Sequence, residues 1–211
     1  MNTVRRQHCP VRRFPFFRSM VAAAITCLAS LLFADDPKFT VGIDTICPYG
    51  LAGCWPEARE PITKVPGVTT VSEAIDLHTL TCTVQMKQGV ILDLKILRDG
   101  LRKRVGNSFT VRGVEATFQG VLVRDACDLA LQICGTSHIF RLAPLHQKVQ
   151  TDDSKLAQWP TDDEFGAYGR LASGYNGQSC SLQVSGPLVD QSNGSTLLEV
   201  RQFQWMQDVK E

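Results

Sequence analysis

Residues 54–68 read CWPEAREPITKVPGV, and this stretch decides how the first part of the chain is expected to fold. Residues 55–65 are a short helical candidate, which a Pro-Gly pair brings to an end. Pro56 suits the first turn of such a helix, where a backbone N–H has no intrahelical partner. Pro61 has no N–H to donate, so we expect it to kink the helix or delay its start.

Strands are expected on both sides of this helix. Residues 39–47 (FTVGIDTIC) alternate and are rich in β-formers, which predicts a strand, and the Pro-Tyr-Gly that follows breaks it. Residues 68–86 alternate in two pieces with a bend near Thr79. They predict a hairpin or a long bulged strand.

Residues 92–105 form the clearest helical pattern, and a strand is expected to follow at 109–114. Three basic residues fill the last turn of this helix, and Gly106 is a typical C-terminal stop. We interpret the basic cluster as a solvated helix end. The apolar face consists of Leu94, Leu97, Leu101 and Val105.

The spacing of apolar residues after Cys54 resembles that of the heavy-metal-associated domain family. That family has a Cys-x-x-Cys pair, a helix, and then an apolar residue, any residue and Gly-Val. The resemblance covers about 75 residues and implies a ferredoxin-like βαββαβ domain over residues 37–114. The matching positions are Cys54, Ala58, Ile62, Val65, Gly67 and Val68.

In that family two thiolates bind a soft ion such as Cu(I), because soft sulfur selects soft metals. Leu51 stands here at the first cysteine position, and Cys54 matches the second. Cys47 lies four residues before Leu51 and could fold back toward Cys54 to give a Cys-x6-Cys pair. The resemblance therefore implies copper or another soft metal ion at Cys54 and Cys47. The alternative is a disulfide between them, in which case neither binds metal.

The second part of the chain, residues 115–207, is expected to be a small all-β domain, an OB-like barrel or a sandwich. The overall class is therefore α+β. An acidic segment at 146–164 is interpreted as a surface loop. Strands are expected at 117–123, 129–134, 139–142, 166–173, 180–184 and 197–205.

Residues 1–34 have the order of a signal peptide: arginines, an apolar run at 20–33, and Ala34 before Asp35. Export to a periplasm, a cell envelope or the extracellular space is expected. The run is too short for an ordinary membrane span, so we expect membrane contact only if this segment stays uncleaved.

Six cysteines remain after residue 34, and an even set in an exported chain favours disulfides. Six cysteines allow 15 pairings, and the sequence does not choose among them. Local bridges between Cys47 and Cys54 and between Cys127 and Cys134 are plausible, and buried free thiols are the alternative.

Basic and acidic residues nearly balance, at 22 against 21, and no basic stripe with interleaved aromatics is present. Nucleic acid is therefore not an expected partner. No catalytic motif is found, so an enzyme is not expected. The expected function is an exported binding protein that takes a soft metal ion through Cys54 and Cys47. The alternative is a disulfide-stabilised structural or protein-interaction module without metal, whose protein partner is unknown.

Overall fold

The computed structural model describes residues 37–125, 128–146, 160–177, 180–192 and 194–206. The expected signal segment, Cys127 and residues 147–159 of the expected loop lie outside the described residues. Within the described part, the chain is a sheet-rich α+β protein with nine strands and three α-helices. In chain order the elements are β1 (Lys38–Thr45), α2 (Gly50–Thr63), β2 (Val68–Val71), β3 (Thr81–Met86), α3 (Leu94–Val105), the 3₁₀ turn η2 (Gly106–Ser108), β4 (Phe109–Asp125), β5 (Asp128–Ile133), β6 (Ile139–Pro144), α4 (Asp162–Gly174), β7 (Cys180–Asp190), β8 (Thr196–Val200) and β9 (Gln202–Trp205).

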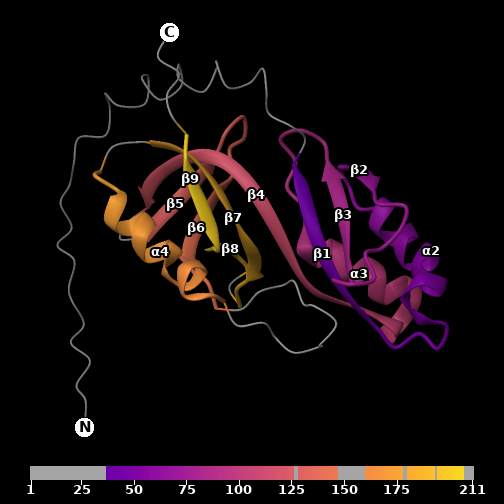
Figure 1. Cartoon of the computed structure of the whole chain (residues 1–211). Coiled ribbons are helices and arrows are strands. Elements are labelled where there is room, and N and C mark those ends of the chain that lie inside the picture. Colours follow the sequence, from indigo (N-terminus) through magenta and orange to yellow (C-terminus); the bar gives the residue numbers. More distant parts are fainter. Residues whose placement is uncertain (1–36, 126–127, 147–159, 178–179, 193, 207–211) are drawn as a thin grey trace.

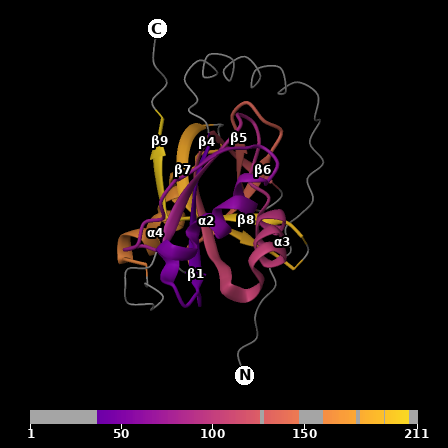
Figure 2. The same ribbon diagram turned by 90° about the vertical axis from the view of Figure 1, so that its right-hand side faces the viewer.

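The first half is an antiparallel arrangement of strands in the order β2-β3-β1-β4. β1 lies between β3 and β4, so Val41 is opposite Cys82 on one side and Val114 on the other. α2 packs on α3 and on β2, and α3 packs on β4. Figure 2 views the molecule from the side that carries α2.

Alternation and capping explain the elements that the sequence predicted here. In β1, Phe39, Val41 and Ile43 are fully buried on one face of the strand. α3 begins after Asp93, whose carboxylate accepts a hydrogen bond from the Ile96 N–H at 2.9 Å. It ends at Gly106, which adopts a φ of +61° that favours glycine.

α2 differs from the prediction, because it begins at Gly50 rather than at Trp55. Both Pro56 and Pro61 therefore lie inside the helix, where each removes a backbone hydrogen bond. Burial outweighs this cost, because the apolar face already begins at Leu51. The buried residues recur at helical spacing, namely Leu51, Cys54, Trp55, Ala58, Pro61 and Ile62.

The expected strands 109–114 and 117–123 are one continuous strand, β4, of 17 residues. Its beginning pairs with β1, and its remainder pairs with β7 and β5 (Figure 1). Gly120 allows β4 and β5 to approach each other closely, because a β-carbon there would lie 2.4 Å from the carbonyl oxygen of Gln132 on β5. The predicted boundary between Val114 and Glu115 falls inside this strand.

The second half is a closed ring of five strands in the order β4-β5-β6-β8-β7, with β7 pairing back to β4. β6 and β8 are parallel, and the other pairs are antiparallel. α4 lies between β6 and β7 in the chain and packs against β6 and β8. The ring interior is filled by apolar side chains, including Phe118, Leu122, Leu131, Phe140, Leu182 and Leu198.

The strand expected at 166–173 is wrong, because these residues belong to the helix α4. A capping box starts it: Thr161 accepts from the Glu164 N–H, and the Glu164 carboxylate accepts from the Thr161 N–H at 2.9 Å. Ala167 and Leu171 then bury one face. Residues 162–164 are accordingly the first helical turn and not part of a loop.

The strand expected at 197–205 is two strands, β8 and β9, that separate at Arg201. Arg201 forms an ion pair with the buried Glu115 of β4, with 3.1 Å between nitrogen and oxygen. Among the described residues, none of the helices is long and apolar enough to cross a membrane.

Candidate functional site

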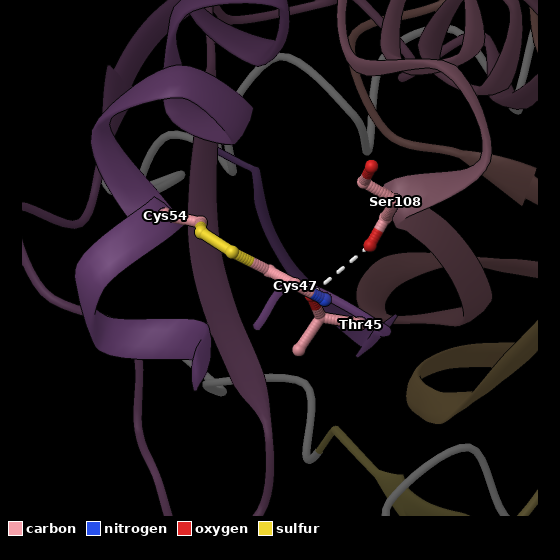
Figure 3. Close-up of a disulfide and its surroundings, with 4 residues drawn as sticks. All are labelled: Thr45, Cys47, Cys54 and Ser108. Atoms are coloured by element: carbon pink, nitrogen blue, oxygen red, sulfur yellow. Dashed lines mark hydrogen bonds between the residues drawn. A yellow bond between two sulfur atoms is a disulfide. The ribbon is translucent and has the colours of Figure 1, made fainter. Parts of the chain in front are cut away.

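Cys47 and Cys54, the two predicted site residues, are joined by a disulfide (Figure 3). Cys47 follows the end of β1, and Cys54 lies in the second turn of α2. Their Cα atoms are 6.6 Å apart, which lies within the range that a disulfide spans. The structure therefore brings the predicted pair together, as the bridge that the sequence left as an alternative.

The segment that carries Cys47 is held by hydrogen bonds to Thr45 and Ser108. The Thr45 hydroxyl donates to the Ser108 carbonyl at 3.0 Å, and the Cys47 N–H donates to the Thr45 hydroxyl at 3.0 Å. The Ile46 N–H donates to the same Ser108 carbonyl at 3.1 Å. These bonds tie the end of β1 to the start of β4, beside the disulfide (Figure 3).

The start of α2 is fixed mainly by packing and by the disulfide. Its N-cap residue, Tyr49, makes no side-chain hydrogen bond to the helix. Cys54 is 8% exposed, and the neighbouring Trp55 donates from its indole nitrogen to the Glu73 carbonyl at 3.0 Å. A bonded sulfur has no thiol proton to lose, so neither cysteine offers a thiolate while the bridge is intact.

His78 and Cys82 are also potential metal ligands by residue type, but they differ in their surroundings. His78 is in an exposed turn, where its N–H and that of Thr79 donate to the Asp76 carboxylate and lower the pKa of Asp76. Cys82 is buried on β3, and burial raises the pKa of its thiol to about 12. Cys82 is therefore a core thiol that keeps its proton.

Two other histidines lie on the second half of the chain. His138 is exposed in the turn between β5 and β6, and the His146 ring lies 2.8 Å from the buried Glu199 carboxylate. Across the part of the chain that the structure describes, no three His, Cys, Asp or Glu side chains gather as a group that could hold a metal ion.

Two apolar residues beside the disulfide were not identified from the sequence. Ile46 and Tyr49 are 78% and 84% exposed on the short connection between β1 and α2. Leu77 is 53% exposed in the turn before β3. This turn lies at the same end of the sheet as the connection between β1 and α2, as the hydrogen bond from the Ile43 N–H to the Leu80 carbonyl shows. The alternation of the strand could have identified Ile46. Phe39, Val41 and Ile43 face the core at every second position, and Ile46 does not fit this spacing.

Comparisons with protein-family models, with curated proteins and with solved structures give no match.

Proposed function

We propose that this chain is an exported, disulfide-stabilised interaction module that binds a protein partner without metal. We further propose that its first half is a ferredoxin-like unit related to heavy-metal-associated domains. The strand order β2-β3-β1-β4, with a helix after β1 and another after β3, supports this proposal. The closed five-strand ring, with the helix α4 between β6 and β7, supports an OB-like barrel for the second half.

The observation that supports this function is the exposure of Ile46 and Tyr49 on the connection between β1 and α2, which is held in a fixed conformation. Large apolar side chains gain nothing from facing water, and groups of them mark interaction surfaces. Here the Cys47–Cys54 bridge and the hydrogen bonds to Ser108 hold the connection in place. A fixed connection loses little conformational entropy when a partner covers it, and tyrosine suits such contacts.

Photo-crosslinking in the producing cells tests this function. A benzoylphenylalanine at position 49 is compared with one at Phe165, which is a matched control because it is also exposed (67%) but lies on α4. We expect a crosslinked product that is specific to position 49 and that Ile46→Ser reduces. If both positions give the same products, the surface at Tyr49 is not the interaction site.

Export is tested separately with a reporter. Residues 1–45 are fused to alkaline phosphatase, which is active only after export, and the mature N-terminus is read by mass spectrometry. We expect activity and a chain that begins near Asp35, as the signal pattern predicts. The control is the same phosphatase fused to an unrelated signal peptide. If the control is active and the fusion to residues 1–45 is inactive, export is removed from the proposal.

Soft-metal binding by Cys54 and Cys47 is the second candidate, and the disulfide itself favours it. Two sulfurs close enough to bond can also approach one ion after reduction, and two thiolates suit Cu(I). Titration of the reduced protein with Cu(I) under anaerobic conditions is expected to show one equivalent bound, with Cys54→Ser binding none at this site. Equal uptake by both proteins would exclude Cys54 as a ligand.

A further inference from the structure

A groove of about 420 Å³ runs between α2 and α3, and it is separate from the connection that carries Tyr49. Its volume lies within the range of known ligand sites. Four of its lining residues are apolar or lack a side chain: Pro61, Val65, Ile96 and Gly100. Ile96 is 44% exposed, whereas Pro61 and Val65 are buried, so the apolar lining meets solvent mainly at Ile96.

Two neighbouring residues in the lining of the groove are poor helix formers. Pro61 and Gly100 both lie inside helices, where each costs free energy relative to alanine. Close packing does not require glycine here, because an added β-carbon would lie at an ordinary contact distance of 3.9 Å from Pro61. Gly100 lines the groove without a side chain of its own, so a larger residue there would take up part of its volume.

The edge of the groove is mainly positive. Lys64, Lys103 and Arg104 contribute three cations, and Glu60 contributes one carboxylate. Glu60 bonds both Lys64 and Arg104, which lowers the pKa of Glu60. Lys103 makes no ion pair with any residue in the described ranges, so its charge is available to a ligand.

We propose that this groove binds an acidic segment of a partner protein. An apolar side chain of the segment lies against the floor formed by Pro61, Val65 and Ile96, and flanking carboxylates meet Lys103 and Arg104. The charge of the edge selects an acidic ligand, and the open apolar floor suits a side chain that points out of an extended peptide. This contact is independent of the interaction at Tyr49 and goes beyond the proposed function.

An array of synthetic octapeptides tests the proposal with the purified protein. Each labelled peptide carries Leu, Ile, Val or Phe at its two central positions and Asp or Glu elsewhere. One control array replaces the acids by lysine, and a second replaces the apolar residues by serine. We expect saturable binding, measured by fluorescence anisotropy, for members of the acidic apolar array only.

Protein variants then locate the binding. Gly100→Leu, which fills the groove, and Lys103→Glu, which reverses a charge at its edge, are each expected to weaken binding about tenfold. Glu60→Gln is expected to strengthen it about threefold, because it frees two cations. Lys95→Glu is the matched control, since Lys95 is exposed on α3 but does not line the groove. Tyr49→Ser should leave binding unchanged, which separates this proposal from the proposed function.

Three outcomes would overturn the proposal. The first is that no acidic apolar peptide binds, and the second is that Gly100→Leu and Lys103→Glu both bind as well as the unchanged protein. The third is that phosphatidylglycerol vesicles bind in a Lys103-dependent manner while the peptides do not, which would make the surface a membrane contact. Lys103→Glu keeps the test valid if Gly100→Leu unfolds, because Lys103 is exposed.

Discussion

Gly100 of α3 faces Pro61 of α2 so closely that a β-carbon on the glycine would touch the proline ring without a clash, at 3.9 Å. Gly100→Ala is therefore expected to raise the free energy of unfolding by about 1 kcal/mol, because alanine is the better helix former. Urea denaturation monitored by circular dichroism measures this change. The same variant narrows the groove, so it should bind acidic peptides less well while it is more stable.

Gly67→Ala is the contrasting control for that measurement. Gly67 adopts a φ of +87°, and a β-carbon there would lie 2.6 Å from the Val90 side chain. Alanine at this position should lower the free energy of unfolding by more than about 1 kcal/mol. If both glycine variants change the free energy of unfolding in the same direction, either the space beside Gly100 or the steric conflict at Gly67 is contradicted.

The Cys47–Cys54 bridge is expected to stabilise the folded chain. It closes a short loop with a sequence separation of 7, for which restriction of the unfolded chain predicts about 2 to 3 kcal/mol. The double variant Cys47→Ala/Cys54→Ala should lose that amount in urea denaturation under non-reducing conditions. A double variant as stable as the unchanged protein would contradict a structural role for the bridge.

Cys82 is expected to make stability depend on pH. Burial raises the pKa of its thiol from 9.0 to about 12, so the unfolded chain releases this proton at a lower pH than the folded chain. The contribution of Cys82 to the free energy of unfolding is fully present below about pH 9. It is lost as the pH rises toward 12, by up to about 1.4 kcal/mol per pH unit. Urea denaturation between pH 8 and 10.5 measures the slope, which should be shallower in Cys82→Ala.

The reactivity of Cys82 provides an independent check. A protonated, buried thiol reacts slowly, because the thiolate is the nucleophile. Iodoacetamide at pH 8, followed by peptide mass analysis, should label Cys82 in urea but scarcely in the folded protein. Rapid labelling of the folded protein would show that the thiol is accessible.

The capping box of α4 predicts the effect of Thr161→Ala. The variant removes the side-chain acceptor of the Glu164 N–H and a hydroxyl bonded to the Glu164 carboxylate at 2.9 Å. We expect a loss of about 1 kcal/mol in thermal or urea unfolding. Ser173→Ala lies on the same helix, is exposed, and should change stability by less than about 0.5 kcal/mol. Equal effects would show that the cap is not the cause.

Much of the secondary structure of the first half could be predicted, because local patterns agree there with burial. The leucines of α3 lie on one face, and Phe39, Val41 and Ile43 of β1 face the core. The start of α2 could not be placed from local signals, because Pro56 and Pro61 suggested a shorter helix. Packing of Leu51 and Trp55 overrides the prolines, and only the tertiary structure supplies that packing.

The second half was harder to predict, and α4 shows why. Gly166 and Gly169 weaken its helical pattern, and the sequence therefore predicts a strand at this position instead of a helix. Thr161 followed by Glu164 was the signal that could have identified the helix start. The continuity of β4 also depends on distant partners, since three different strands supply its hydrogen bonds.

The spacing of Cys47 and Cys54 was compatible with a metal pair or with a disulfide, and the structure joins the two residues by a disulfide. Binding of a soft metal by the reduced pair stays a prediction. The groove between α2 and α3 could not be predicted, because Pro61 and Gly100 meet only when two helices distant in the chain pack together.

β4 has a consequence for how the two halves could cooperate. They are joined by a continuous strand and not by a loop, so their relative orientation changes only if the strand bends or its hydrogen bonds break. A partner held in the α2–α3 groove would therefore keep a fixed orientation relative to the five-strand ring. A ligand that reached both halves at once would experience a high effective concentration for its second contact, with little entropy lost in ordering a linker.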